Sequence, residues 1–281
     1  PAQADGLAST DVFYLFEDNA HRLWIAGRNT ASVYDAATKT FQHFPVGHSE
    51  QTIDVSATIF QDTRGIIWLA GGQMSGLHRF NEQSQQFEEI EDVPTNRFSL
   101  GDNKVTTLFE DLSGILWIGT VRVGAASLNL TEPGFALYQQ LPGNPNSIST
   151  SYVYSIYEDR SGSLWIGGDD GVLNRFDRAQ NTITHYEPDG ENSQGLSPSF
   201  SISALFEDSQ NTFWVGTFDG GLHIMNRETG MFEQFHPDGQ PGSLASNIIL
   251  SLFEDSHQNL WVGTGYPSAL QRFDRSTRTF V

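Results

Sequence analysis

An acidic pair, Glu254 and Asp255, stands shortly before Trp261 in the stretch LFEDSHQNLWVGT. Two carboxylates beside an aromatic ring could be the two working groups of a glycosidase, one protonating the leaving oxygen and the other acting as base or nucleophile. That chemistry depends on the separation of the two carboxyl groups in space, which adjacency in sequence does not establish. The first question is therefore whether the pair occurs once, as an active site requires.

The motif occurs six times, with Gln61 in place of the first acid in one copy, which indicates a structural repeat and argues against a catalytic centre. Every tryptophan of the protein follows an aspartate by six residues, and successive tryptophans lie 44, 49, 48, 49 and 47 residues apart. A period of this size is typical of repeat architectures. The pairs are Asp18 and Trp24, Asp62 and Trp68, Asp111 and Trp117, Asp159 and Trp165, Asp208 and Trp214, and Asp255 and Trp261.

Glycine three residues after the aspartate indicates what the aspartate does. Gly65, Gly114 and Gly162 occupy the fourth position of a predicted tight turn, in which an aspartate side chain accepts backbone N–H bonds. The tryptophan then starts a strand and can cover the seam between repeats with its large apolar ring. We expect the signature to fasten a hairpin. The alternative is an acidic ring that attracts a cation, although the spacing of a calcium-binding loop is absent.

Each repeat divides into four short segments that are rich in β-branched and aromatic residues and separated by turn residues. Such segments predict strands joined by hairpins, and four antiparallel strands per repeat form a blade of a β-propeller. We predict an all-β fold in which residues 1–281 form a single propeller domain with six blades; part of a seven-bladed propeller is the alternative. The expected blades span residues 7–45, 52–92, 103–141, 151–188, 200–237 and 247–281.

Composition excludes several classes of function. A net charge of −19 with only two lysines argues against nucleic acid and anionic membranes as partners. The chain contains no cysteine, so disulfides and thiolate metal sites are excluded, and its eight histidines lack metal-binding spacing. No apolar run is long enough to span a bilayer, and no signal peptide is visible. We expect no metal and no cofactor.

Motifs of the common catalytic classes are also missing. The sequence has no GxSxG elbow, no HExxH zinc motif and no phosphate-binding P-loop. We therefore assign no catalytic residue and expect a protein that is not an enzyme.

Length differences between the repeats point to one face of the propeller. From each tryptophan to the end of the third strand the distance varies between 11 and 13 residues, and the connections between blades vary as well. The turns between strands one and two, and between strands three and four, keep a constant length. In an up-and-down blade the varying connections share one face, here called the loop face, and the constant turns share the opposite turn face. Because loops tolerate change and carry binding function, the loop face is the predicted functional surface.

The candidate ligand-binding residues are those at which the loop between strands two and three departs from, or defines, the repeat. They are Arg28 and Asn29 in blade one, Gln73 in blade two, Arg122 in blade three, Asp169 and Asp170 in blade four, Phe218 and Asp219 in blade five, and Tyr266 in blade six. Arginine, amide and aromatic side chains around a channel mouth could hold a polar ligand. Ordinary solvated loop tips are the alternative for each of them.

The repeated pattern resembles two-component regulator propeller repeats. The segments VTTLFEDLSGILWIGT, VYSIYEDRSGSLWIGGDDGVLNRFD and ILSLFEDSHQNLWVGT carry the likeness, which extends over residues 7–281. This resemblance implies a periplasmic or extracellular sensor region of a bacterial membrane signalling protein. It also implies neighbouring sensor, transmembrane and kinase or cyclase domains. The family usually has seven blades, and blades one and three lack its Gly-Gly-Leu after the second strand.

The hypothesis from sequence is a sensor propeller that binds a small molecule or an oligosaccharide on its loop face. One rival is a glycoside hydrolase or lyase, because the Asp-to-Trp turn resembles the Asp-box turn of sialidase-like propellers. Such an enzyme also needs an arginine cluster, for which Arg28 and Arg122 supply two members. The other rival is a scaffold for protein partners. A homodimer is left open.

Overall fold

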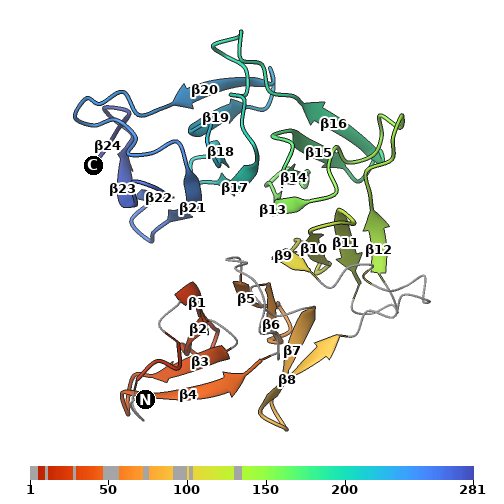
Figure 1. The fold of residues 1–281 in the computed structure, drawn as a ribbon, viewed down its shortest axis with the longest axis vertical. Helices are drawn as coiled ribbons and strands as arrows, with labels where there is room; N and C mark the ends of the chain where they lie inside the picture. The colour runs from red at the N-terminus through yellow and green to blue at the C-terminus, as the bar shows by residue number, and fades with distance from the viewer. Residues whose placement is uncertain are drawn as a thin grey trace. The chain divides into compact units, whose positions relative to one another are not determined.

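The computed structural model describes residues 6–9, 12–27, 30–46, 57–71, 76–90, 100, 104–129 and 135–281. Within these residues every regular element is a β-strand, and the strands form six four-stranded sheets (Figure 1). Strands that are neighbours in a sheet are also consecutive in the chain. The predicted fold class, an all-β propeller with four-stranded antiparallel blades, is confirmed. In this described part of the chain no helix is long and apolar enough to cross a membrane.

The chain divides into two compact units, Pro1–Tyr138 and Gln139–Val281. Each unit contains three blades. The prediction that residues 1–281 form one domain stays a prediction.

The first unit holds blades one to three. Blade one consists of β1 (Val12–Glu17), β2 (Leu23–Gly27), β3 (Thr30–Asp35) and β4 (Thr40–Pro45). Blade two consists of β5 (Ala57–Gln61), β6 (Ile67–Gly71), β7 (Leu77–Asn81) and β8 (Gln86–Ile90). Blade three consists of β9 (Val105–Glu110), β10 (Leu116–Thr120), β11 (Ala125–Leu128) and β12 (Phe135–Tyr138).

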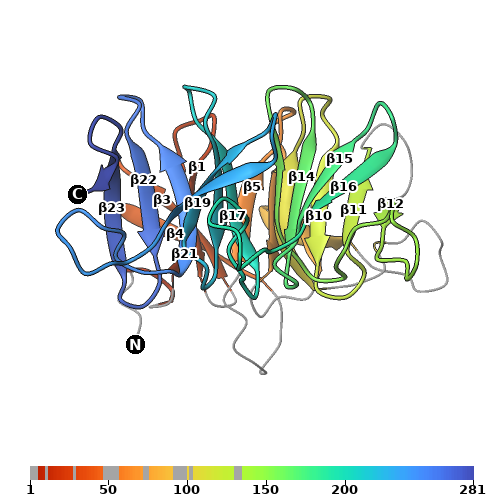
Figure 2. The same cartoon turned by 90° about the horizontal axis from the view of Figure 1, so that it is seen from above.

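The second unit holds blades four to six, and Figure 2 shows its strands running between two opposite sets of connections. Blade four consists of β13 (Val153–Glu158), β14 (Leu164–Gly168), β15 (Leu173–Asp177) and β16 (Thr182–Tyr186). Blade five consists of β17 (Ile202–Glu207), β18 (Phe213–Thr217), β19 (Leu222–Asn226) and β20 (Met231–Phe235). Blade six consists of β21 (Ile249–Glu254), β22 (Leu260–Thr264), β23 (Ala269–Asp274) and β24 (Thr279–Phe280).

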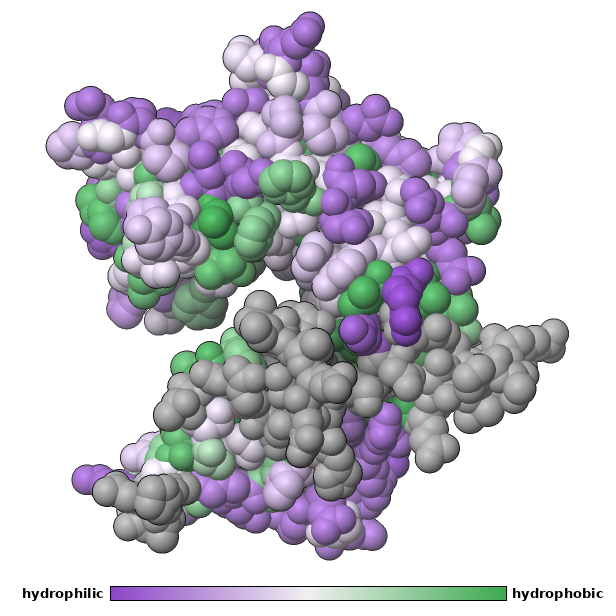
Figure 3. Space-filling model, in the orientation of Figure 1, coloured by the Kyte–Doolittle hydropathy of each residue, from purple (hydrophilic) through white to green (hydrophobic). Residues whose placement is uncertain are grey.

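Tryptophan rings form much of the core between consecutive blades. Trp24 of blade one is fully buried and packs against Phe80 of blade two, and Trp214 of blade five packs in the same way against Phe273 of blade six. The ring centroids of Trp214 and Phe273 lie 5.0 Å apart in an edge-to-face arrangement, which is a favourable geometry for aromatic pairs. In blade six, Trp261 is only partly buried, and apolar surface lies over β21 to β23 in Figure 3.

Glycine near the end of the second strand lets the next blade approach. A Cβ atom on Gly167 would lie 2.5 Å from Cβ of Ile202, and one on Gly216 would lie 2.6 Å from Cγ2 of Ile249. Because atoms this close must move apart, any larger residue would push the following blade away. The glycine of WIGG in blade four and of WVGT in blade five therefore reflects close packing of a strand-one isoleucine on the preceding blade.

Candidate functional site

The aspartate of each repeat is a structural acceptor. In all six blades one carboxylate oxygen accepts a hydrogen bond from Nε1 of the tryptophan six residues later, at 2.8 to 3.0 Å. The other oxygen of Asp208 accepts the backbone N–H groups of Gln210 and Thr212, each at 2.9 Å. The residue three places after the aspartate has a positive φ, for example +81° at Gly162 and +65° at Asn211. This carboxylate therefore fastens the hairpin of its own blade.

The acidic residue before the aspartate fastens one blade to the preceding blade. Glu207 of blade five accepts the backbone N–H of Arg160 in the blade-four turn, and Glu254 of blade six accepts that of Ser209 in the blade-five turn, both at 2.7 Å. Blade two has Gln61 at this position, whose Oε1 accepts the N–H of Asn19 at the same distance. Only an acceptor oxygen is needed at this contact. Sequence reasoning missed this role because the donor lies in another repeat.

Arginines complete the network on the turn face of the second unit. Arg227 contacts Asp159 of the preceding blade at 3.1 Å and Glu207 of its own blade at 2.6 Å. Burial raises the pKa of Asp159, but the hydrogen bonds from Ser161 and Trp165 and the charge of Arg227 outweigh it, so the pKa lies below its ordinary value. A carboxylate held ionised and fully bonded is a poor general acid or base at neutral pH.

The structure places some of the predicted site residues and not others. Arg28, Asn29 and Gln73 lie outside the described residues. Arg122 is exposed in the connection after β10. Tyr266 is 88% exposed, and its backbone carbonyl accepts a hydrogen bond from Ser246 Oγ at 2.8 Å.

The predicted acidic residues of blades four and five help to hold the loops. Oδ1 of Asp169 accepts a hydrogen bond from Thr150 Oγ1 at 2.5 Å, and Oδ1 of Asp170 accepts the N–H of Val172 at 3.1 Å. Oδ1 of Asp219 accepts a hydrogen bond from the backbone N–H of Phe200 at 2.9 Å. Each of these three carboxylates thus helps to fix the backbone or a side chain of its own loop face.

One exposed aromatic residue of the loop face escaped the sequence prediction. Phe200 is 75% exposed in the connection between blades four and five. Its N–H is the donor to Asp219, and the N–H of Phe218 donates in turn to the carbonyl of Ser201 at 3.0 Å. Phe200 and Phe218 thereby lie on backbone segments that are hydrogen-bonded to each other. The signal was present, since the equivalent residues of blades four and six are Ser151 and Asn247.

Polar side chains on the third strands anchor the connecting loops of the second unit. Asn174 Oδ1 accepts the N–H of Ser149 at 2.9 Å, and Gln271 Oε1 accepts that of Ala245 at 2.7 Å. The equivalent residue of blade five, His223, accepts the N–H of Ser197 at 3.3 Å and is completely buried. Burial lowers the pKa of His223 to about 4, so its imidazole is neutral at physiological pH. These contacts hold each loop in one place.

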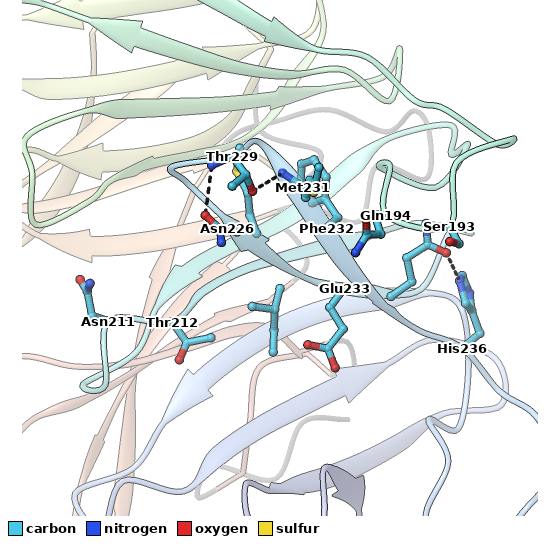
Figure 4. A pocket seen from close by; sticks show the side chains of 13 residues that line it. Ser193, Gln194, Asn211, Thr212, Asn226, Thr229, Met231, Phe232, Glu233 and His236 are labelled. Carbon is cyan, nitrogen blue, oxygen red and sulfur yellow. Dashed lines mark hydrogen bonds between the residues drawn. The ribbon is translucent and has the colours of Figure 1, made fainter.

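A groove lies along β19 and β20 of blade five, with a volume of about 910 Å³ (Figure 4). Its walls carry amide and hydroxyl groups beside Met231 and Phe232. The carboxylate of Glu233 in this groove is paired with Arg278 of blade six. A second groove of about 590 Å³ lies on the turn face between blades four and five. None of the predicted ligand-binding residues lines either groove. Among the described residues, no group of three histidine, aspartate or glutamate side chains could hold a metal ion.

A family model for the two-component regulator propeller matches residues 147–170, 195–219 and 243–266. Each matched segment runs from an anchored loop through the aspartate turn to the end of the second strand, in blades four, five and six. The resemblance seen in the sequence is therefore confirmed over these three segments.

Relatives in sequence and structure are longer signalling proteins. Histidine kinase P4 of Formosa agariphila is 29% identical over 102 residues, which are 35% of this chain and 7% of the kinase. The extracellular domain of a putative hybrid two-component system from B. thetaiotaomicron matches 99% of this chain with a TM-score of 0.77 and 22% identity. That of a putative one-component system from the same organism matches 95% with a TM-score of 0.72 and 20% identity. The chain spans 35% and 33% of those two solved chains.

The fold is shared with an enzyme as well. Catalytically inactive virginiamycin B lyase from Staphylococcus aureus matches 98% of this chain, and 85% of its own, with a TM-score of 0.71 and 13% identity. At these identities the structural likeness establishes the propeller fold alone.

Proposed function

We propose that this chain is the sensor propeller of a bacterial two-component type signalling protein, exposed to the periplasm or the cell exterior. It binds a small molecule or glycan fragment on its loop face and passes the signal to neighbouring sensor, transmembrane and kinase or cyclase domains. The family repeats and the signalling relatives support the class of protein. The separation of roles between the two faces supports the location of the ligand.

One observation carries the location. On the turn face, the repeated carboxylates are engaged by tryptophan, backbone N–H and arginine groups. The loop face instead presents exposed side chains, Tyr266 and Phe218 among them, on loops that polar side chains hold in place. Rigid loops with exposed, repeat-specific side chains are suited to recognition.

Calorimetric titration with a panel of oligosaccharides, amino acids and peptides tests the proposal. We expect at least one ligand whose affinity falls about tenfold or more in Arg28→Ala or Arg122→Ala, since a charged hydrogen bond is worth about 1.5 to 3 kcal/mol. Arg160→Ala, on the turn face, is the matched control and should bind like the wild type. A ligand that is unaffected by both loop-face variants, or is lost in the control, contradicts the loop-face location.

The hydrolase alternative depended on the carboxylates of the aspartate turn. Asp208 and Asp255 are both hydrogen-bonded to a tryptophan, so neither is positioned as a free acid or base. No contact in the described residues favours the enzyme over the sensor. Release of a fluorophore from a glycoside panel by the purified chain would reverse this preference.

A further inference from the structure

The face of blade six that carries Trp261 is uncovered, whereas the same face of blade five is buried. Trp214 is completely buried, and Trp261 is only partly buried. Leu222 and Leu270 each pair with the glycine two residues after the tryptophan of their blade. Leu222 is fully buried, yet Leu270 is 69% exposed, and Phe253 on the first strand is 62% exposed. A repeat that ends an array normally has a polar outer face, which this apolar face is not.

The seams within the second unit show what covers such a face. Trp214 and Leu222 of blade five pack in one cluster with Ile249, Phe273 and Phe280 of blade six. The cluster between blades four and five has the same composition. The cover is therefore the first strand and the aromatic outer strands of the following blade.

Two hydrogen-bond donors on the uncovered face indicate the same kind of neighbour. Oγ of Ser155 in blade four donates to the first strand of blade five at 3.0 Å, and the N–H of Ser209 in blade five donates to Glu254 of blade six at 2.7 Å. The equivalent donors of blade six are Oγ of Ser251 and the N–H of Ser256. Neither has an acceptor among the residues that the structure describes. Their natural acceptors are a strand-one carbonyl and the acidic residue at the end of that strand.

Glycine leaves space for a side chain of the same neighbour. A Cβ atom on Gly216 would lie 2.6 Å from Cγ2 of Ile249 in the next blade. A Cβ atom on Gly263 of blade six would instead have its nearest neighbours in Ser251 of the same blade. The place that a strand-one isoleucine takes in the other seams is therefore open on blade six.

We propose that this face of blade six receives a further blade of the same repeat, contributed by the same polypeptide in a protein longer than residues 1–281. The first strand of that blade places a β-branched side chain over Gly263 and accepts the hydroxyl of Ser251, and its last residue accepts the N–H of Ser256. The relatives support a longer protein, since this chain spans 35% and 33% of the two solved signalling chains. The inference goes beyond the proposed function and does not depend on any ligand.

A duplicated blade tests the proposal in the full chain. Residues 234–281 are appended after Val281, because Phe232 and Phe280 occupy the same position of the fourth strand. NMR measurement of amide exchange then follows the N–H of Ser256, with that of Ser209 as an internal reference. We expect exchange at Ser256 to slow about tenfold or more in the extended chain, while Ser209 is protected in both chains.

Variants of the extended chain separate specific docking from general stabilisation. Glu254→Ala in the appended copy removes the acceptor and should restore fast exchange at Ser256. Glu254→Gln in that copy should keep the protection, because Gln61 accepts the same contact in blade two. Leu270→Ala in the original blade six should lower the melting temperature of the extended chain by about 4 °C or more. The same substitution should change the 1–281 chain little, because Leu270 is exposed there.

Unchanged exchange at Ser256 on extension overturns the inference, and so does protection that survives Glu254→Ala in the copy. An appended copy that stays unfolded also counts against it, since a blade suited to this face folds upon it. Protection of Ser256 already present in the 1–281 chain overturns it as well. If that protection grows with protein concentration, a second copy occupies the face, and if it does not, the chain covers the face itself.

Discussion

The turn face and the loop face of the second unit use carboxylates in opposite ways. Asp208 on the turn face binds Trp214, two backbone N–H groups and Arg275. Asp219 on the loop face accepts one hydrogen bond, from the backbone N–H of Phe200. Both oxygens of Asp208 are engaged by groups of the fold. Among the described residues, Asp219 has a contact at one oxygen only. Both residues are aspartates in turns. In a repeat protein, the number of hydrogen bonds that a carboxylate already accepts therefore distinguishes a structural aspartate from a candidate binding aspartate.

Among the substitutions that test this comparison, removal of a buried tryptophan should have the largest effect on stability. Trp214→Ala leaves a cavity between blades five and six, and we expect the free energy of unfolding to fall by about 3 to 5 kcal/mol in urea denaturation. Trp261→Ala, in which the ring is only partly buried, should cost about half as much. Equal losses would mean that burial between blades does not decide the contribution of the tryptophans.

Asp208→Asn should have an intermediate effect, about 1 to 3 kcal/mol, because Arg275 then loses a buried charged partner. Burial raises the pKa of Asp208, but the hydrogen bonds from Trp214 and Thr212 and the contact with Arg275 outweigh it, so the pKa lies below its ordinary value. A lowered carboxyl pKa in the folded state adds stability above the unfolded pKa, near 3.8, and this stability is lost as the pH falls toward the folded value. Urea titrations at several pH values below about 5 should therefore show a shallower acid loss in the variant. Identical pH profiles would argue that this carboxylate is not the stabilising group.

The same substitution on the other face should have the smallest effect on stability. Asp219→Asn preserves the hydrogen bond to Phe200 and removes a charge from an acidic surface, so we expect a change within about 0.5 kcal/mol. Thermal unfolding monitored by circular dichroism is sufficient to measure it. A loss of stability as large as that of Asp208→Asn would show that the carboxylates of the loop face stabilise the fold as much as those of the turn face.

The fold and the fastening aspartates could be predicted because their partners are local. Asp208 and Trp214 are six residues apart in one hairpin, and repetition of this spacing makes the signal strong. The role of Glu254 could not be predicted, since its donor Ser209 lies in another blade and becomes a neighbour only when the blades pack. For the same reason the grooves of blade five, which depend on side-chain packing, left no mark in the sequence.

Part of the candidate site was within reach of the sequence and part was not. Phe218 and Asp219 were selected because they lie in a loop of the variable face. Phe200 was missed because its connection was compared by length and not residue by residue. Arg28, Asn29 and Gln73 stay predictions, because they lie outside the described residues.

The acceptor before each aspartate gives the array of blades a direction. Glu207 and Glu254 each accept a hydrogen bond from the turn of the preceding blade. A blade of this kind therefore provides an acceptor to the blade before it and an N–H donor to the blade after it. A duplicated blade would inherit both halves of this contact. The presence of Gln61 in this place shows that the contact tolerates loss of charge. Copying whole blades is thus a simple genetic route by which loops on one face can diversify while the seams stay compatible.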